Sequence, residues 1–257
     1  MNPKTYRTLQ ILILVSLGIF LAQKLISGSL YYYINQRFFG LVWFGVAGFL
    51  FLAFILFRAR GEAQAHEHEH EHEHEHEHDH DHDHEEKGAL WALFLVALPV
   101  LLGVLIPASP LGASAIGNRG ISANAPLTFD ASGSLFQLEV PPNDRTILDW
   151  VRMYNFSQDP AEMIGQAADV VGFVYQDPRL SEGQFMVGRF TLSCCVADAF
   201  AIGMIVAWPD SANLPDNQWV RVKGPVDVLA IEGQTLPLIH AESVQTVDEP
   251  AQPYLFP

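Results

Sequence analysis

An alternating tract of histidine and acidic residues carries the most evident chemistry in this sequence. Every even position from 66 to 84 is histidine, and every odd position between them is glutamate or aspartate. Imidazole binds divalent transition metals such as zinc, and carboxylates can supplement it. The candidate ligands are His66, His68, His70, His72, His74, His76, His78, His80, His82 and His84.

The histidine tract is expected to bind several divalent ions loosely rather than one ion in a rigid site. An extended tract would project all the imidazoles on one side, and a helical tract would stack histidines four residues apart. Overlapping pairs of histidines would exchange ions with one another, because no surrounding residues pack against the tract to hold the ligands in place. The zinc-protease motif HExxH recurs at every step of the alternation, so we treat it as a by-product. A solvated loop lengthened by codon slippage and a pH sensor are the alternatives.

A second set of metal-ligating side chains lies near the middle of the C-terminal half. Cys194 and Cys195 are the chain's two cysteines, and Asp198 closely follows them. Adjacent side chains of a regular strand point to opposite faces, so both thiols could face one ion only at a bulge or strand end. There, two thiolates and a carboxylate, with His240 as a candidate fourth ligand, would suit a soft metal ion.

The two cysteines also allow a structural and a catalytic interpretation. Free cysteine is commonly buried, so one thiol could be a core residue and the other half exposed. A nucleophilic thiol needs a nearby base, and His240 lies far along the chain. The sequence has no GxSxG, P-loop or dinucleotide-binding motif. We therefore expect no enzyme and no organic cofactor.

Three apolar runs in the N-terminal half predict membrane helices. They are Leu9–Ile26, Phe38–Phe57 and Ala89–Ile106. The second run is uncharged and long enough to cross a hydrocarbon core of about 30 Å. The first run could be a signal peptide, but it lacks a small-residue cleavage site. The third run is short, and a helix in the core of a soluble domain is the alternative interpretation for it. We expect a transmembrane hairpin over 1–60 and a third transmembrane helix over 89–107.

The charge distribution predicts the orientation of the chain in the membrane. Its net charge of -15 resides in the histidine tract and the C-terminal half, whereas the apolar part is basic at its edges. Lys and Arg in the short flanks favour a cytoplasmic N-terminus, with the linker 61–88 also cytoplasmic and the C-terminal domain outside. We expect a multi-pass protein of the bacterial plasma membrane with the lipid bilayer as a partner. Nucleic acid is not an expected partner, because no basic patch could neutralise phosphates.

The remainder of the chain is expected to be a flexible linker over 108–125 and a soluble β-rich domain over 126–257. Helical spacing predicts a helix at Thr146–Phe156 with Asp144 as its N-cap. Glycines inside two of the strand-like runs that follow suggest bends at barrel corners. The five runs are Asp169–Tyr175, Gln184–Cys194, Gly203–Trp208, Trp219–Ala230 and Leu236–Val247. The expected fold class is thus membrane α, with two or three transmembrane helices, followed by a five-stranded OB-like barrel with a preceding helix.

Several motifs of the C-terminal half carry a family resemblance. They are L-T-F-D at Leu127–Asp130, G-F-V-Y-Q-D-P-R at Gly172–Arg179, R-F-T-L-S-C-C-V-A-D-A at Arg189–Ala199, W-V-R-V-K-G at Trp219–Gly224 and P-A-Q-P-Y-L at Pro250–Leu255. With the apolar runs and the histidine-rich connector, they make nearly the whole chain resemble the bacterial family of predicted two-component permease subunits typified by YcgQ. Val196 departs from the alanine that is common in the family at this position.

The resemblance implies a membrane protein that accompanies a multi-spanning permease, and it hints at divalent metal homeostasis, especially of zinc. It supplies no transport substrate and no catalytic residues. The apolar runs contain no acid or histidine of the kind that marks an ion route, so the chain is expected to assist a transporter. Two other functions remain open: a membrane-tethered sensor or scaffold whose barrel binds a partner protein, and an enzyme with a cysteine nucleophile.

Overall fold

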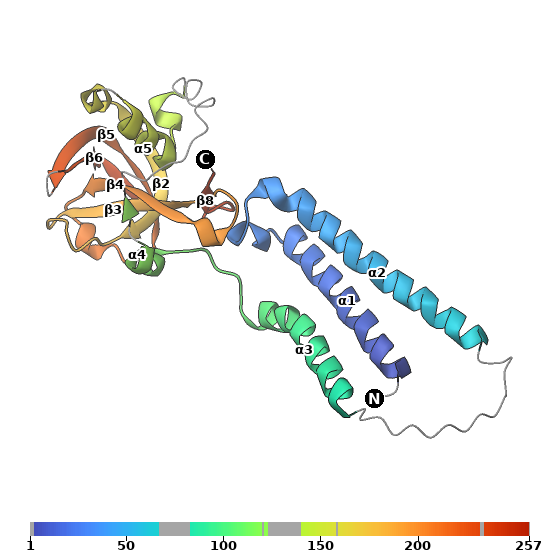
Figure 1. The fold of residues 1–257 in the computed structure, drawn as a ribbon. Helices are drawn as coiled ribbons and strands as arrows, with labels where there is room; N and C mark the ends of the chain where they lie inside the picture. Colours follow the sequence, from blue (N-terminus) through green and yellow to red (C-terminus); the bar gives the residue numbers. More distant parts are fainter. Residues whose placement is uncertain are drawn as a thin grey trace. The chain divides into compact units, whose positions relative to one another are not determined.

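The computed structural model describes residues 3–66, 83–119, 121–122, 140–157, 159–231 and 234–256. These residues fold as two compact units, whose elements are labelled in Figure 1. One unit comprises Met1–Leu30 and Gln36–Ala108, and the other comprises Tyr31–Asn35 and Ser109–Pro257. Positions 67–82 of the histidine tract lie outside the described residues, as does the motif Leu127–Asp130.

Three long helices make up the first unit. They are α1 (Pro3–Ile26), α2 (Phe39–His66) and α3 (Asp83–Leu105). Each helix contains one of the apolar runs that predicted it. Within the described residues, the segments Thr5–Ile26 and Gln36–Ala59 are long and apolar enough to cross a membrane, whereas Trp91–Leu105 of α3 is a shorter apolar stretch.

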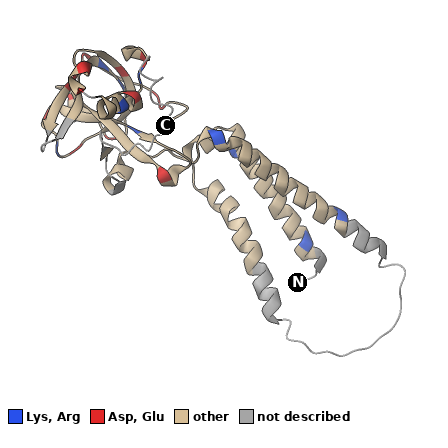
Figure 2. Cartoon of the chain, turned by 45° about the horizontal axis from the view of Figure 1, so that its top comes forward, with Lys and Arg blue, Asp and Glu red and all other residues tan. Residues whose placement is uncertain are grey.

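The surface of these helices is apolar. Leu12, Leu41 and Phe44 are 59%, 68% and 76% exposed within the chain. The described charged residues of α1 and α2 stand near the helix ends, as Figure 2 shows. Such a surface is poorly solvated by water and well solvated by hydrocarbon, so these helices associate with a membrane.

Glycines let the three helices approach each other closely. α1 contacts both α2 and α3. A Cβ atom at Gly18 of α1 would lie 3.0 Å from a methyl carbon of Leu50 in α2. A Cβ atom at Gly103 of α3 would overlap the ring of Phe20 in α1. Small residues at helix contacts are a common feature of membrane helix packing.

The second unit is a mixed β domain with two helices. The helices are α4 (Ala113–Arg119) and α5 (Ile147–Phe156). The strands are β1 (Ile121–Ser122), β2 (Ala167–Tyr175), β3 (Gln184–Thr191), β4 (Phe200–Ala207), β5 (Trp219–Ile231), β6 (Gln234–His240), β7 (Ser243–Thr246) and β8 (Tyr254–Leu255). The short 3-10 helices of this unit are η4 (Pro142–Asp144), η5 (Pro160–Met163), η6 (Val196–Asp198) and η7 (Ser211–Asn213), whereas η2 (Gln36–Phe38) belongs to the first unit and η1 (Ser29–Tyr32) spans the boundary between the two.

Five of the strands pair in a closed cycle. β2 pairs with β3, β3 with β4, β4 with β6, β6 with β5, and β5 with β2. The β4–β6 pair is parallel and the other four are antiparallel. The short strands β1, β7 and β8 extend this sheet by pairing with β4, β5 and β3.

β5 serves two parts of the sheet because it changes partners at Gly224. Its first half pairs with β2 and β7, and from Val226 onward it pairs with β6. A Cβ atom at Gly224 would overlap the backbone carbonyl of His240. Only glycine therefore fits where β5 passes this close to the end of β6.

The core of the β domain lies under α5. Ile147, Trp150 and Val151 of this helix are buried in one cluster with apolar residues of β2 to β6. Thr146 caps the helix by accepting the backbone N–H of Asp149, whose carboxylate accepts the N–H of Thr146 in return. This capping box corrects the prediction of Asp144 as N-cap, because that residue ends the preceding 3-10 helix.

Several predicted boundaries of the C-terminal half were wrong, among them the start of β4, which is Phe200 and not Gly203. The segment 108–125 is not wholly a linker, because it contains α4 and β1, and Ile116 of α4 is 2% exposed against Phe190 and its neighbours. The last predicted strand is two strands, β6 and β7. The predicted strand Gln184–Cys194 corresponds to β3, which ends at Thr191, three residues before Cys194.

Candidate metal centre

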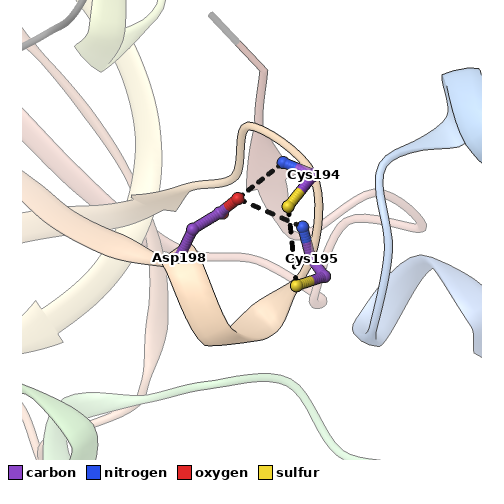
Figure 3. A group of neighbouring side chains, drawn as sticks. All are labelled: Cys194, Cys195 and Asp198. Carbon is purple, nitrogen blue, oxygen red and sulfur yellow. Dashed lines mark hydrogen bonds between the residues drawn. The ribbon is translucent and has the colours of Figure 1, made fainter.

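The candidate site is the loop that joins β3 to β4. The two strands are paired up to Thr191 and Phe200, and the chain between them makes a short loop that ends in η6. Figure 3 shows that the loop brings Cys194, Cys195 and Asp198 together. Among the described residues, these three form a group whose potential ligand atoms all lie within 4.8 Å of one another.

Asp198 organises the loop through its carboxylate. Its Oδ2 atom accepts the backbone N–H groups of Cys194 at 2.7 Å and Cys195 at 3.3 Å. Its Oδ1 atom accepts the N–H of Ser193 at 3.1 Å. Three consecutive N–H groups are therefore directed at one side chain, which fixes the backbone that carries both thiols.

The two thiols lie next to each other at the surface. The thiol of Cys194 donates to the sulfur of Cys195 at a distance of 3.6 Å, and Cys194 is exposed while Cys195 is half-buried. The hydrogen bond to Asp198 raises the pKa of Cys194 to about 11, helped by the bond to Cys195. Without a bound cation, this thiol is therefore protonated at neutral pH.

The carboxylate of Asp198 is ionised in the same loop. Partial burial opposes this by favouring the neutral acid, but the hydrogen bonds from the Cys194 thiol and from three backbone N–H groups outweigh it. The pKa of Asp198 is consequently lowered. A negative charge thus stands beside the protonated thiol of Cys194, which favours a cation there over a second anion.

The spacing of the thiols fits a tetrahedral ion. Two thiolates bound at about 2.3 Å to a tetrahedral zinc ion would stand about 3.8 Å apart, whereas a linear ion would hold them about 4.6 Å apart. The observed sulfur–sulfur distance of 3.6 Å is close to the first value. A zinc ion there would need further ligands beyond the two thiolates, since structural and catalytic sites are usually four-coordinate.

Asp198 has little remaining capacity to act as a ligand. An ionised carboxylate offers about four lone-pair sites, and three backbone N–H groups occupy all but about one of them. The residual site is on Oδ1, which accepts only Ser193 from the loop backbone. The carboxylate would therefore bind an ion through one oxygen at most, and its main role is to position the thiols.

A segment from the N-terminal half completes the loop. Residues Tyr31–Asn35 belong to the β domain, and Ile34 forms a β-bridge with Cys195. The N–H of Asn35 donates to the carbonyl of Cys194 at 2.9 Å, and the N–H of Val196 donates to the carbonyl of Tyr33 at 2.8 Å. Sequence reasoning missed this contact, because a short segment between two apolar runs carries no sign of a partner in the C-terminal half.

The C-terminal tail supports the other side of the loop. Arg189 of β3 donates to the carbonyl oxygens of Gln252 at 2.7 Å, Pro253 at 2.8 Å and Val171 at 3.2 Å. Burial lowers the pKa of Arg189 to about 10, so the guanidinium is still charged at neutral pH. β8 is thereby held beside β3, where the N–H of Leu192 donates to the carbonyl of Leu255.

The other predicted ligands do not join this cluster within the described residues. His240 pairs with Ala207 at the end of β4 opposite to Phe200, roughly 20 Å along the strand from the thiol loop. Its Nε2 atom lies 3.0 Å from Oδ2 of Asp227 instead. Of the histidine tract, His66 ends α2 and His84 lies in the first turn of α3, and the other eight histidines fall outside the described residues.

Family models match both halves of the chain. The model of the DUF1980 N-terminal domain matches residues 9–122, and that of the DUF1980 C-terminal domain matches residues 143–257. The second match includes the thiol loop, and the first includes Tyr31–Asn35 and α1 from Leu9 onward. Both parts that meet at the loop are thus parts of one family's architecture.

Two curated proteins and one solved structure are similar to parts of this chain. UPF0703 protein YcgQ of Bacillus subtilis is 30% identical over 109 residues, which are 40% of this chain and 36% of that protein. A Streptococcus mutans protein named "Putative two-component membrane permease complex subunit" is 24% identical over 63% of this chain and 72% of its own length. A small single-stranded DNA-binding protein from Streptomyces coelicolor matches 33% of this chain and 96% of its own with 18% identity and a TM-score of 0.21, which is too slight to carry an argument.

Proposed function

Because the chain belongs to the DUF1980 family, we propose that it is the membrane-anchored accessory subunit of a permease complex that serves divalent metal homeostasis, with zinc as the first candidate ion. The observation that carries the proposal is the pair of thiols at tetrahedral spacing, 3.6 Å apart, on a chain anchored by apolar helices. The printed name of the Streptococcus mutans relative supports the permease part. The multi-spanning permease itself would be the partner in the same membrane.

An accessory role fits the helices better than a transport pathway does. The segments Thr5–Ile26, Gln36–Ala59 and Trp91–Leu105 contain no acidic residue and no histidine. An ion route through a membrane is usually marked by such side chains facing other helices or water. We therefore assign ion passage to the partner, and ion capture or delivery to this chain.

The contact of Tyr31–Asn35 with the β domain supports a three-span topology. If α1 and α2 both cross the membrane, the segment that joins them lies on the side opposite to the N-terminus. The β domain is hydrogen-bonded to this segment, so it lies on the same side. α3 must then cross as well, although its apolar stretch Trp91–Leu105 is short and would need local thinning of the bilayer.

Orientation and location follow from the basic flanks. A cytoplasmic N-terminus places the histidine tract in the cytoplasm and the thiol loop outside the plasma membrane of a bacterium. The tract would then hold divalent ions loosely through its ten imidazoles, on the side opposite to the thiols. The two ligand sets would serve the two ends of one transport route.

A tethered sensor or scaffold is the second candidate function. Its supporting observation is again the docking of Tyr31–Asn35, which ties the β domain to the connection between two membrane helices. The closed cycle of five strand pairings supports an OB-like barrel as the partner-binding module. In that case metal would alter an association and not a flux.

Cellular metal content tests the proposed function. Cells that lack the chain would be complemented with the wild type, with a Cys194→Ser/Cys195→Ser double variant, or with a deletion of residues 66–86, and their zinc measured by mass spectrometry under zinc limitation. Asp210→Asn is the matched control, because this exposed carboxylate precedes η7 without capping it. We expect both altered chains to change cellular zinc at least about twofold and the control to behave as wild type. Unchanged zinc in all strains would overturn the transport role and favour the scaffold.

A further inference from the structure

The segment Tyr31–Asn35 is an integral part of the β domain although it is covalently continuous with α1 and α2. It contacts the thiol loop through the hydrogen bonds of Tyr33 and Asn35, and it contacts the C-terminal tail through Tyr32. The hydroxyl of Tyr254 lies 3.4 Å from the carbonyl oxygen of Tyr32, and the side chain of Tyr32 is hydrogen-bonded to Glu249. These hydrogen bonds make the five-residue segment Tyr31–Asn35 part of the fold of the β domain.

Asn35 makes two hydrogen bonds to the backbone that carries the thiols. Its side chain donates from Nδ2 to the carbonyl of Ser193 at 3.0 Å, and its backbone N–H donates to the carbonyl of Cys194 at 2.9 Å. Asn35 is only 4% exposed. A buried residue that donates to two successive carbonyls, one through its side chain and one through its backbone N–H, holds these peptide planes in one orientation.

Asn35 and Asp198 bind opposite polar groups of the thiol-loop backbone. Asp198 accepts the N–H groups of Ser193, Cys194 and Cys195, while Asn35 donates to the carbonyls of Ser193 and Cys194. Both sets of bonds together fix the backbone from which the two thiols project. Loss of either set would let this backbone relax and would weaken the positioning of the thiols.

We propose that Asn35 is a positioning residue of the thiol pair, and that through it an ion at Cys194 and Cys195 is coupled to the connection between α1 and α2. This inference rests on the proposed function for the ion, and goes beyond it by giving the site a connection to the membrane helices. Coupling is reciprocal by thermodynamic necessity. If the hydrogen bonds of Asn35 favour ion binding, a bound ion must favour the formation of those hydrogen bonds by the same free energy.

Cobalt(II) binding to the full-length chain in detergent tests the positioning role. Cobalt bound to thiolates gives a charge-transfer absorption that imidazoles and carboxylates do not give, so this signal reports on the thiols alone, and the histidine tract competes for cobalt equally in every variant because it is unchanged. We expect Asn35→Ala to weaken the affinity of the thiolate-bound cobalt about tenfold or more, as is typical for groups that orient metal ligands. The control Asn213→Ala removes an exposed amide of η7 and should leave the affinity unchanged.

Hydrogen exchange of the wild-type chain tests the coupling without any change in Asn35. The N–H of Asn35 is bonded to the carbonyl of Cys194, and it should exchange more slowly with zinc than without. The Cys194→Ser/Cys195→Ser variant should lose this effect of zinc. Thiolate-bound cobalt with equal affinity in Asn35→Ala, and exchange that does not respond to zinc, would overturn the coupling and leave the proposed function intact. Absence of any cobalt–thiolate absorption in the wild type would overturn both.

Discussion

Asp198 accepts the backbone N–H of Cys194 at 2.7 Å and also binds the thiol of the same residue. One carboxylate thus fixes the backbone of a cysteine and keeps its sulfur protonated. The arrangement resembles a helix capping box more than a set of metal ligands, because Asp198 is the last residue of η6 and bonds back to the residues before it. An ion that binds here must displace thiol protons, with the charge of Asp198 in its favour.

Replacing Asp198 with asparagine should make Cys194 more reactive. The side-chain hydrogen bond and the charge of Asp198 raise the pKa of this thiol, so their loss should lower it from about 11 and increase the thiolate fraction at pH 8. For each unit by which the pKa falls, the alkylation rate should rise about threefold, since tenfold more thiolate is offset by lower nucleophilicity. Mass spectrometry of iodoacetamide-treated protein measures the rate, with Asp210→Asn as the control. An unchanged or slower rate would contradict the role given to Asp198.

Substitution of Gly224 should destabilise the β domain. In Gly224→Ala, the new Cβ would overlap the carbonyl of His240, and backbone atoms must move to relieve it. We expect a loss of about 2 kcal/mol in the free energy of unfolding, measured by thermal unfolding of the detergent-solubilised chain. The matched control is Gly117→Ala in α4, where no atom lies within 4 Å of the new Cβ and helix propensity should make the change neutral or slightly stabilising. Equal melting temperatures for both variants would contradict the close approach of β5 and β6.

The ion pairs of Asp169 predict a contribution to stability that depends on pH. Hydrogen bonds from Arg221 and Lys223 lower the pKa of Asp169 below its value in the unfolded chain, about 3.9, although partial burial opposes them. The stabilisation is therefore fully present above about pH 4 to 5 and is lost as the pH falls through the folded-state pKa. Asp169→Asn should lower the melting temperature by a few degrees at most at pH 7, and this difference should shrink as the pH falls below the pKa of the folded state. A difference that persists in acid would show that packing, not charge, is lost.

Labelling from one side of the membrane tests the proposed topology. Cys194 and Cys195 are the chain's two cysteines, so a membrane-impermeant maleimide reports directly on the thiol loop. In intact cells with a permeable outer layer, these thiols should react. In a background with both cysteines replaced by serine, Ser27→Cys should react from the same side, whereas Gln64→Cys should react only after the cells are opened. Reaction of Gln64→Cys in intact cells would exclude the orientation with the N-terminus inside.

Sequence patterns predicted the features that depend on side-chain chemistry. Apolar runs located α1, α2 and α3, and the residue types of Cys194, Cys195 and Asp198 marked the cluster that the fold brings together. The ligand role of that cluster and of the histidine tract stays a prediction. Strand patterns found the strands of the cyclic pairing, but they placed the end of β3 three residues too late.

Contacts made by backbone groups were not predictable from the same patterns. Asn35 binds the thiol loop across a sequence separation of 158 residues, and a polar residue between two apolar runs carries no sign of such a partner. Tyr33 accepts the N–H of Val196 and Tyr32 contacts the C-terminal tail, and neither contact is indicated by residue type. His240 illustrates the converse, since its residue type suggested a ligand and the strand register places it at the opposite end of β4.

The central claim is that Cys194 and Cys195 together bind a tetrahedral ion, and X-ray absorption at the zinc edge tests it most directly. The sample is the full chain with residues 67–82 removed, loaded with one equivalent of zinc in detergent, so that the histidine tract does not compete. We predict two sulfur ligands at about 2.3 Å in the wild type and none in the Cys194→Ser/Cys195→Ser variant. A zinc environment made only of nitrogen and oxygen, identical in both proteins, would contradict the account.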